Sequence, residues 1–483
     1  MNFKAALSLL TAMTLPLAAS EWVEITQRSS GKSLKVIVLA LEDGKITFET
    51  QKGKTFTTKS SALTDESIER AQQSLSSSEE GSEEQLQAIN DAIGHQLFKS
   101  MQPLWKQDAG TVASRVSWPL ESSSEQSSSY RYYPPKTYTF LGAHPYSAVL
   151  YGNSKENPTH LSLVFANKGD YGSRLGMGED HFKKIHPNKE VPKSLEKAIQ
   201  LDAQVITDAL TEAIGTPKKQ YFGEKEDKRR VLRWNFGSHA FILSEKKSEY
   251  TSLLIVPTSV ADNQGKVAFV KDAELRSIVA DNVERSDNGD TVIKNIPMVD
   301  QGPKGYCAPA TFERAMRYML VPADMYLLAT VATDPEGGTN TMLLADSAKR
   351  IIRSKARRIK DLSLEKDLKM RKVKQFIDKG VPILWQMRSL KEYNDLANKR
   401  TSEREEIEDY AVWSQTISAE AEQIVDRLQT NDSNHHICLI IGYNEATNEI
   451  AVSDSWGPRY ALRWVHIDIA QAVTSRGGFV IDL

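Results

Sequence analysis

The chain has 483 residues, of which 40% are hydrophobic and 26% charged, and its formal net charge is −2. This length predicts about three domains of ordinary globular composition. The balanced charge, with no Lys/Arg tract interleaved with aromatic residues, argues against a nucleic-acid partner. The two cysteines, Cys307 and Cys438, exclude a disulfide scaffold, although one bridge between them stays open.

The N-terminus has the pattern of a secretory signal peptide over residues 1–20. Lys4 gives a positive start, an apolar run follows to Ala19, and the small residues before Glu21 suit cleavage. The run is shorter than the roughly 20 residues that a membrane helix needs, and a retained anchor is the alternative. No later segment is apolar enough to span a membrane. We therefore expect an exported protein, periplasmic or secreted, without an integral membrane segment after signal removal.

Residues 21–73 predict a small all-β module of three to five strands. Its alternating apolar runs are separated by turns, and one of these, Asp43-Gly44, is a strong hairpin signal. Together with Trp22 and the closing segment Leu63 to Glu66, the turns make the module similar to the Sla-type homology domain one, an SH3-like barrel. That resemblance implies a short peptide ligand. The alternative is a small barrel of unknown partner.

Residues 74–84 are rich in Ser and Glu and predict a polar linker. A helix is expected after it, over about 83–101, and residues 122–129 predict a second polar, Ser-rich break.

Residues 85–290 predict an α+β region whose role does not follow from the sequence. A helix is expected from about Ser194 to Ile214, before Gly215. Each half of the region has a helix followed by three strands, so an internal duplication stays open. The histidines here lack metal-ligand spacing, and we expect neither a metal site nor a cofactor. The expected strands lie at 138–141, 147–151, 160–165, 231–235, 240–243 and 252–256.

Residues 291–483 carry the chemical signature of the chain. Gln301 precedes Cys307 by six positions, and apolar spacing predicts a helix from Ala308 to about Leu320. Cys307 therefore stands at a helix N-terminus, where free N–H groups and the helix dipole favour a thiolate. With a histidine beside it, such a thiolate is an activated nucleophile. Without one, a cysteine at a helix start is more often an inert buried thiol.

The middle of this region is predicted to be helical. A charged stretch at 388–430 is long for a connection inside a compact domain. We interpret it as a lid or substrate-recognition insertion, whose deletion would change substrate choice more than folding, or as a solvated helical hairpin. The other expected elements are helices at 323–332, 341–354 and 364–379 and a strand at 381–387.

Two histidines open a strand that runs to Tyr443. The side chains of His435 and His436 point to opposite faces, so only one of them can face Cys307. Cys438 shares the face of His436 and is predicted to be a buried core thiol. The alternative is an oxidative switch, since a Cys307–Cys438 bridge forms when the Cα atoms lie within about 7 Å.

The order Gln, Cys, His and Asp resembles that of papain-like cysteine peptidases, and the run Cys-Ala-Pro-Ala-Thr from Cys307 resembles their bacteriocin-processing branch, the double-glycine leader peptidases. In the papain-like family five residues separate a His from Gly-Tyr, as they do for His436, and an Asn or Asp precedes Ser-Trp-Gly, as Asp454 does. The resemblance implies a fold with a helical half and an antiparallel sheet. It implies that Gln301 donates to the oxyanion, that His436 is the acid–base partner, that Asp454 orients it, and that Trp456 covers their hydrogen bond.

The chain departs from that branch, whose members are typically fused to a membrane ABC exporter. It has no later membrane span and no Gly-rich phosphate loop, so double-glycine specificity does not follow. The overall prediction is a multidomain α+β chain that hydrolyses peptide bonds in a protein or peptide substrate. An acyltransferase of transglutaminase type on the same fold, and a catalytically retired peptide-binding protein, stay open. The N-terminal region could occlude the cleft as a propeptide does, or dock substrates.

Overall fold

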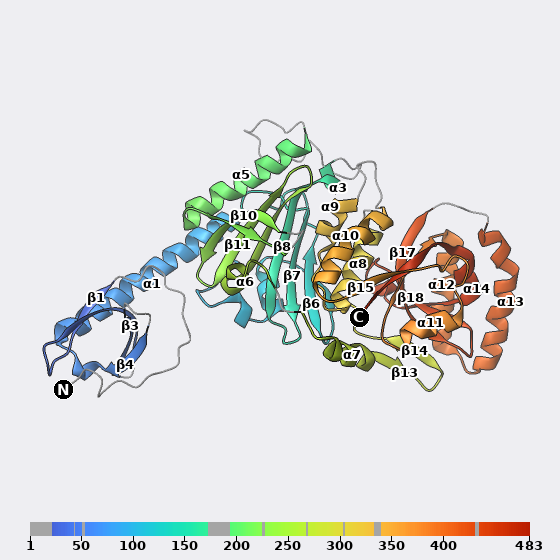
Figure 1. Cartoon of the computed structure of the whole chain (residues 1–483), viewed down its shortest axis with the longest axis horizontal. Coiled ribbons are helices and arrows are strands. Elements are labelled where there is room, and N and C mark those ends of the chain that lie inside the picture. Colours follow the sequence, from blue (N-terminus) through green and yellow to red (C-terminus); the bar gives the residue numbers. More distant parts are fainter. Residues whose placement is uncertain are drawn as a thin grey trace.

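The computed structural model describes residues 22–42, 44–50, 54–171, 194–224, 228–266, 269–302, 305–332, 340–429 and 434–483. The predicted signal peptide, 1–20, lies outside the described residues. Three antiparallel sheets follow one another along the chain, each with helices packed on it (Figure 1). The mixed α+β class is therefore as predicted.

The N-terminal sheet has four strands in the order β1-β2-β3-β4. Among the described residues β1 and β4 do not pair as strands, and an isolated bridge joins Gln27 to Leu63. The sheet is therefore open, and its resemblance to an SH3-like barrel stays a prediction. The strands are β1 (Val23–Thr26), β2 (Ser33–Glu42), β3 (Lys45–Thr50) and β4 (Thr55–Lys59).

Helix α1 (Asp65–Ile93) runs without a break through residues 74–84, the predicted polar linker, so this stretch is helical. Ala71 packs in the core of the N-terminal sheet, and Ile89 and Ile93 pack in the core of the next region (Figure 1). A helix held at both ends extends through polar residues because each added residue gains a hydrogen bond once the helix is nucleated. The helix expected over about 83–101 is the end of α1, which stops at Gly94, where φ is +79°.

The central sheet has eight strands in the order β5-β6-β7-β8-β12-β11-β10-β9. Helix α5 (Leu195–Ile214) packs on it, capped by Ser194 and ended by Gly215 as predicted. The expected strand at 138–141 is absent; Phe140 and Ala143 form only an isolated bridge there. The strands are β5 (Leu120–Ser123), β6 (Ser127–Tyr132), β7 (Ser147–Asn153), β8 (Pro158–Asn167), β9 (Lys218–Phe222), β10 (Arg229–Phe236), β11 (His239–Lys246) and β12 (Tyr250–Pro257).

The Ser-rich stretch at 122–129, predicted as a break, is instead part of the edge hairpin β5–β6. Ser122, Ser128 and Ser129 are buried there. Buried hydroxyls need hydrogen-bond partners, and the next region supplies one to Ser122 and one to Ser129. Residues 122–129 therefore have the composition of a loop but lie at the interface between the central and C-terminal regions.

The C-terminal sheet has the order β13-β14-β17-β16-β20-β15; in addition, β18 pairs with β17, and β19 pairs with β18. Helix α11 (Met370–Ile377) begins later than the helix predicted at 364–379, since Leu364 and Leu368 are buried in the loop before it. The strands are β13 (Val283–Arg285), β14 (Asp290–Ile293), β15 (Arg358–Leu362), β16 (Ile383–Arg388), β17 (His435–Asn444), β18 (Glu449–Ser453), β19 (Arg463–His466) and β20 (Thr474–Asp482).

The helices of this region lie on both sides of its sheet. Leu275 and Val279 of α7 (Asp272–Asp281) join its core, so the C-terminal unit begins before the predicted boundary at 291. In Figure 1, α8, α9 and α10 lie between the central sheet and the C-terminal sheet. The other helices are α8 (Cys307–Tyr318), α9 (Met325–Ala332), α10 (Thr341–Ser354), α12 (Lys391–Glu403), α13 (Tyr410–Gln429) and α14 (Ile467–Val473).

Buried charges join the central and C-terminal regions. Arg131 in β6 pairs with Glu121 in β5 at 2.8 Å and with Glu313 in α8 at 2.7 Å. These side chains are 1%, 5% and 0% exposed, in that order. Glu313 also accepts from the Tyr151 hydroxyl at 3.0 Å and from the Met325 N–H at 2.6 Å. Because a buried charge is tolerated only with its partners, the two regions must fold against each other.

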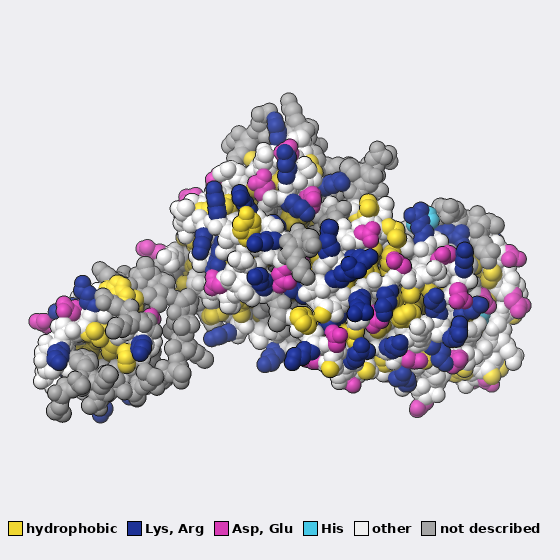
Figure 2. Space-filling model, in the orientation of Figure 1, with side chains coloured by type: hydrophobic (Ala, Val, Ile, Leu, Met, Phe, Trp, Pro, Cys, Tyr) yellow, Lys and Arg dark blue, Asp and Glu magenta, His cyan; other side chains and the backbone are white. Residues whose placement is uncertain are grey.

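An apolar cluster continues this interface. Tyr146 and Val164 of the central sheet pack with Val299, Tyr306 and Ala310 of the C-terminal region. In the part of the chain that the structure describes, no helix is both long and apolar enough to cross a membrane. Figure 2 shows Lys and Arg interspersed with Asp and Glu over the visible face, in keeping with the small net charge.

Replacement of Glu313 by Ala should destabilise the fold strongly. Arg131 loses one of its two carboxylates, and Arg317, 3.3 Å from Glu313, is left buried beside the vacated position. We expect the free energy of unfolding to fall by about 3–5 kcal/mol, measured by urea unfolding.

The matched control is Glu392→Ala, which also removes a carboxylate from an arginine pair. Glu392 and its partner Arg427 are 44% and 62% exposed, so its effect should stay within about 1 kcal/mol. Equal losses in the two variants would contradict a buried network between the regions.

Candidate active site

Cys307 is the first residue of α8, as predicted. Thr311, one turn along, donates to the Ile437 carbonyl in β17 at 3.0 Å, which fixes the helix start against this strand. The thiol is half-buried, and the His436 imidazole beside it lowers the pKa of the thiol. The helix N-terminus and the strand therefore deliver a sulfur atom and an imidazole to the same place.

His436 is buried and His435 is exposed, as expected for successive residues of a strand. The His436 ring stacks on Trp456, with centroids 4.7 Å apart and an interplanar angle of 28°. The indole therefore shields the imidazole from water and limits its rotation.

Asp454 follows β18, the strand paired with β17. The Nε2–H of His436 donates to its Oδ1 at 2.8 Å, and the Asp454 side chain is 1% exposed. With Nε2 engaged in this way, Nδ1 is the nitrogen left to face the thiol. A carboxylate on one ring nitrogen fixes the tautomer and the orientation of the other.

The pKa values of the three groups are displaced in a consistent way. Burial alone would lower the pKa of His436, but its hydrogen bonds to Asp454 and Cys307 raise it to about 9. Burial would raise the pKa of the Cys307 thiol, yet its hydrogen bond to His436 and the imidazolium charge lower it. The pKa of Asp454 is also lowered, since the partners His436 and Arg463 outweigh burial. The directions of these pKa shifts favour a thiolate on Cys307 paired with an imidazolium on His436.

Gln301 is joined to this group through the backbone. Its N–H donates to the carbonyl of Ser455, the residue after Asp454, at 2.8 Å. Gly302, at φ +66°, turns the chain directly after it. The structure therefore brings Cys307, His436 and Asp454 together and ties the segment that carries Gln301 to the same loop.

These positions fall inside a match to a known family. Residues 293–473 match the Peptidase_C39 like family. The predicted resemblance of the C-terminal region is thereby confirmed as a similarity of this region to the Peptidase_C39 like family. A comparison with curated proteins finds no match to the chain.

Arg463 is a residue of the C39-like region that the sequence analysis missed. Its guanidinium, 2% exposed, pairs closely with Oδ2 of Asp454, the oxygen that His436 does not use. It lies over the rings of Trp456 and Tyr460, at 5.3 and 5.6 Å from their centroids. An arginine on a four-residue strand has no local signal of burial, so only the three-dimensional structure shows this contact.

The predicted insertion at 388–430 contributes to this contact. Asn394 and Asn398 of α12 accept from Arg463 at 3.1 and 3.3 Å, and Tyr393 is buried in the core. Part of the insertion is therefore packed structure rather than a solvated hairpin. Its deletion would leave Arg463 without two partners, so we no longer expect folding to survive it.

Cys438 lies in the core of the C39-like region, as predicted, and both cysteines are free thiols in the structure. Burial raises the pKa of Cys438 well above that of an ordinary thiol. A buried neutral thiol of this kind is unreactive. Within the described residues, no group of His, Cys, Asp or Glu is arranged to hold a metal ion.

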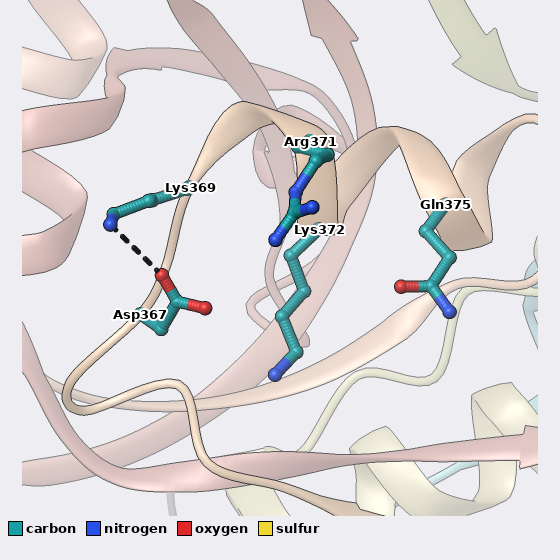
Figure 3. Close-up of a pocket in the computed structure, with 5 residues that line it drawn as sticks. All are labelled: Asp367, Lys369, Arg371, Lys372 and Gln375. Carbon is teal, nitrogen blue, oxygen red and sulfur yellow. Dashed lines mark ion pairs between the residues drawn. The ribbon is translucent and has the colours of Figure 1, made fainter.

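A surface pocket lies at the start of α11, and its lining contains none of the candidate active-site residues (Figure 3). Asp367 and Lys369 form an ion pair there at 3.3 Å. Arg371, Lys372 and Gln375 complete the lining. None of Gln301, Cys307, His436 or Asp454 contributes, so the pocket adds nothing to the chemistry at Cys307.

Replacement of Arg463 by Met should weaken the thiolate. Without the guanidinium, the pKa of Asp454 rises, and a protonated Asp454 no longer accepts from the imidazolium. The rate of Cys307 alkylation by iodoacetamide is measured by mass spectrometry as a function of pH. The pH at which this rate falls on the acid side should be higher in the variant than in the wild type. At pH 6 the rate should fall by about ten- to a hundredfold, less than when the orienting carboxylate itself is lost.

Arg459→Met is the control. Arg459 is exposed, precedes Arg463 by four residues and stacks on Tyr460, a ring that Arg463 also contacts. Its alkylation profile should match that of the wild type. Coincident profiles for the Arg463 variant and the wild type would show that Arg463 does not act through Asp454.

Proposed function

We propose that the chain is a cysteine peptidase that hydrolyses peptide bonds, with Cys307 as the nucleophile. The observation that carries this is the buried imidazole of His436, which is hydrogen-bonded to Asp454 on one side and lowers the pKa of the Cys307 thiol on the other. This is the arrangement that activates a thiol in nucleophilic catalysis. The match of this region to a peptidase family supports the same reaction class.

The reaction begins from the thiolate–imidazolium pair. The Cys307 sulfur attacks the carbonyl carbon of the scissile peptide bond, and the carbonyl oxygen becomes an oxyanion. His436 then gives its proton to the departing amine, which leaves an acyl-enzyme on Cys307. In the second half, His436 takes a proton from water, the water oxygen attacks the thioester, and the thiol is released.

The oxyanion needs donors aimed at the place where the charge develops. The Cys307 N–H, at the start of α8, is one proposed donor, because the first N–H groups of a helix have no partner within it. The side-chain amide of Gln301 is the second. Asp454 holds the imidazole in the tautomer that faces the sulfur, and Trp456 keeps water from their hydrogen bond.

The setting of the reaction is also a proposal. Residues 1–20 have the sequence of an export signal, which supports a periplasmic or secreted peptidase. The open β sheet of residues 23–59, in the N-terminal module, is proposed to hold a short peptide ligand beside the peptidase. Neither cofactor nor metal enters the proposed chemistry.

Comparison of new protein N-termini in cells with the wild-type chain and with Cys307→Ala tests the function. We expect a set of neo-N-termini that depends on Cys307, since hydrolysis of a peptide bond creates one at each cut. His436→Ala should lose the same set, whereas His435→Ala, which changes the exposed neighbour, should keep it. Cross-linked products in place of new N-termini would instead indicate acyl transfer, and identical sets in wild type and Cys307→Ala would remove the proposal.

A further inference from the structure

The central region holds the backbone of the segment that carries Gln301. We call residues 297–302 the glutamine loop. The Ser122 hydroxyl of β5 accepts from the Met298 N–H at 2.9 Å. The carboxylate of Glu121, also in β5, accepts from the Asp300 N–H at 3.1 Å. The hydroxyl of Tyr133, directly after β6, donates to the Asp300 carbonyl.

The C39-like region holds the two ends of the same loop. Arg314 of α8 donates to the Pro297 carbonyl at 2.9 Å, and the Gln301 N–H donates to Ser455 at 2.8 Å. Buried backbone groups are almost always paired, and in this loop both regions supply the partners. Neither region alone satisfies the loop.

Val299 and Gly302 of the loop also pack against the central region. Val299 is fully buried, in a cluster that contains Tyr146 and Val164 of the central sheet. The ring of Tyr133 lies against Gly302, where a Cβ atom would be 3.5 Å from it. The residues on both sides of Gln301 therefore rest on the central region.

We infer that the central region is a built-in part of the active site, in which Glu121, Ser122 and Tyr133 act as positioning residues that aim Gln301 at the oxyanion. This inference rests on the proposed peptidase function. It assigns a role to residues 85–290 other than that of a detachable propeptide or a substrate dock. A donor contributes fully to catalysis only when it is fixed before the oxyanion forms.

The buried pair between Arg131 and Glu313 explains why this support is stable. Glu121, which accepts from the Asp300 N–H, is itself held by Arg131 at 2.8 Å, and Arg131 reaches across to Glu313. Glu313 lies on α8, the helix that begins with Cys307. One network of charges thus fixes the nucleophile's helix and the glutamine loop relative to each other.

Tyr133→Phe in the full-length protein tests the inference, because it removes one hydroxyl and keeps the ring. With p-nitrophenyl acetate as the probe, we expect kcat to fall by about tenfold or more and KM to change little. Loss of an oxyanion donor itself costs roughly 10²- to 10³-fold, and here the donor is loosened rather than removed. The alkylation rate of Cys307 by iodoacetamide should stay within about twofold of wild type, since that reaction forms no oxyanion.

Gln301→Ala closes a double-mutant cycle. If Tyr133 acts through Gln301, the double variant should be no slower than Gln301→Ala alone. Tyr138→Phe is the matched control: its hydroxyl accepts from Trp118 within the central region, at 3.1 Å, and it should hydrolyse the ester like wild type. Ser122→Ala carries the same expectation as Tyr133→Phe if the latter does not fold, as judged by circular dichroism.

Three outcomes would overturn the inference. Wild-type kcat in folded Tyr133→Phe and Ser122→Ala would show that the contacts do not position Gln301. If Tyr133→Phe slows Cys307 alkylation as much as it lowers kcat, the substitution disturbs the whole site. If the effects of Tyr133→Phe and Gln301→Ala on kcat are additive in the double variant, Tyr133 does not act through Gln301. A wild-type chain that neither hydrolyses the ester nor is alkylated at Cys307 would instead remove the proposed function, and the inference with it.

Discussion

A row of ionisable side chains organises the C39-like region. The Cys307 thiol, the His436 imidazole, the Asp454 carboxylate and the Arg463 guanidinium follow one another, and in the proposed resting state their charges alternate in sign. A buried charge without a partner is costly, and here each charge faces the opposite sign. The antiparallel pairing of β17, β18 and β19 is what brings three of these four residues together. The helix that carries Cys307 completes the row, so sheet register and helix position jointly set the reactivity of the sulfur.

The same principle extends to the boundary between regions. Burial raises the pKa of Glu313 to about 7 even though Arg131 and Arg317 stand beside it. The buried pair of Arg131 and Glu313 adds little stability compared with apolar packing. Separation of the two regions would, however, leave its members without their partners, which is costly. The specificity of the interface, rather than its strength, is what keeps the glutamine loop in place. This gives the serine-rich edge hairpin a physical reason for its composition: its hydroxyls meet the backbone and side chains of the other region.

Sequence periodicity and motif spacing predicted α5, α8, β17 and β18, and they singled out Cys307, His436 and Asp454, which the structure places next to one another. Those elements have strong apolar patterns, and Gln301, Cys307, His436 and Asp454 stand at distinctive spacings. The failures have one cause, which is contact between distant segments. The stretch at 122–129 is loop-like in composition, but it pairs with β7, and Arg317 and Met298 of the other region bond its serine hydroxyls. Residues 74–84 become helix because both ends of α1 are packed, and Arg463 is buried only because α12 and Asp454 surround it.

We propose that Cys307, activated by His436, forms a covalent acyl intermediate. This intermediate can be sought by intact-protein and peptide mass spectrometry after a brief reaction with p-nitrophenyl acetate at pH 7. We expect an acetyl group on Cys307 in the wild-type chain, little or none in His436→Ala, and an unmodified Cys438 in both. Acetylation of Cys307 at the same rate in His436→Ala, or no acetylation of Cys307 in the folded wild-type chain, would contradict it.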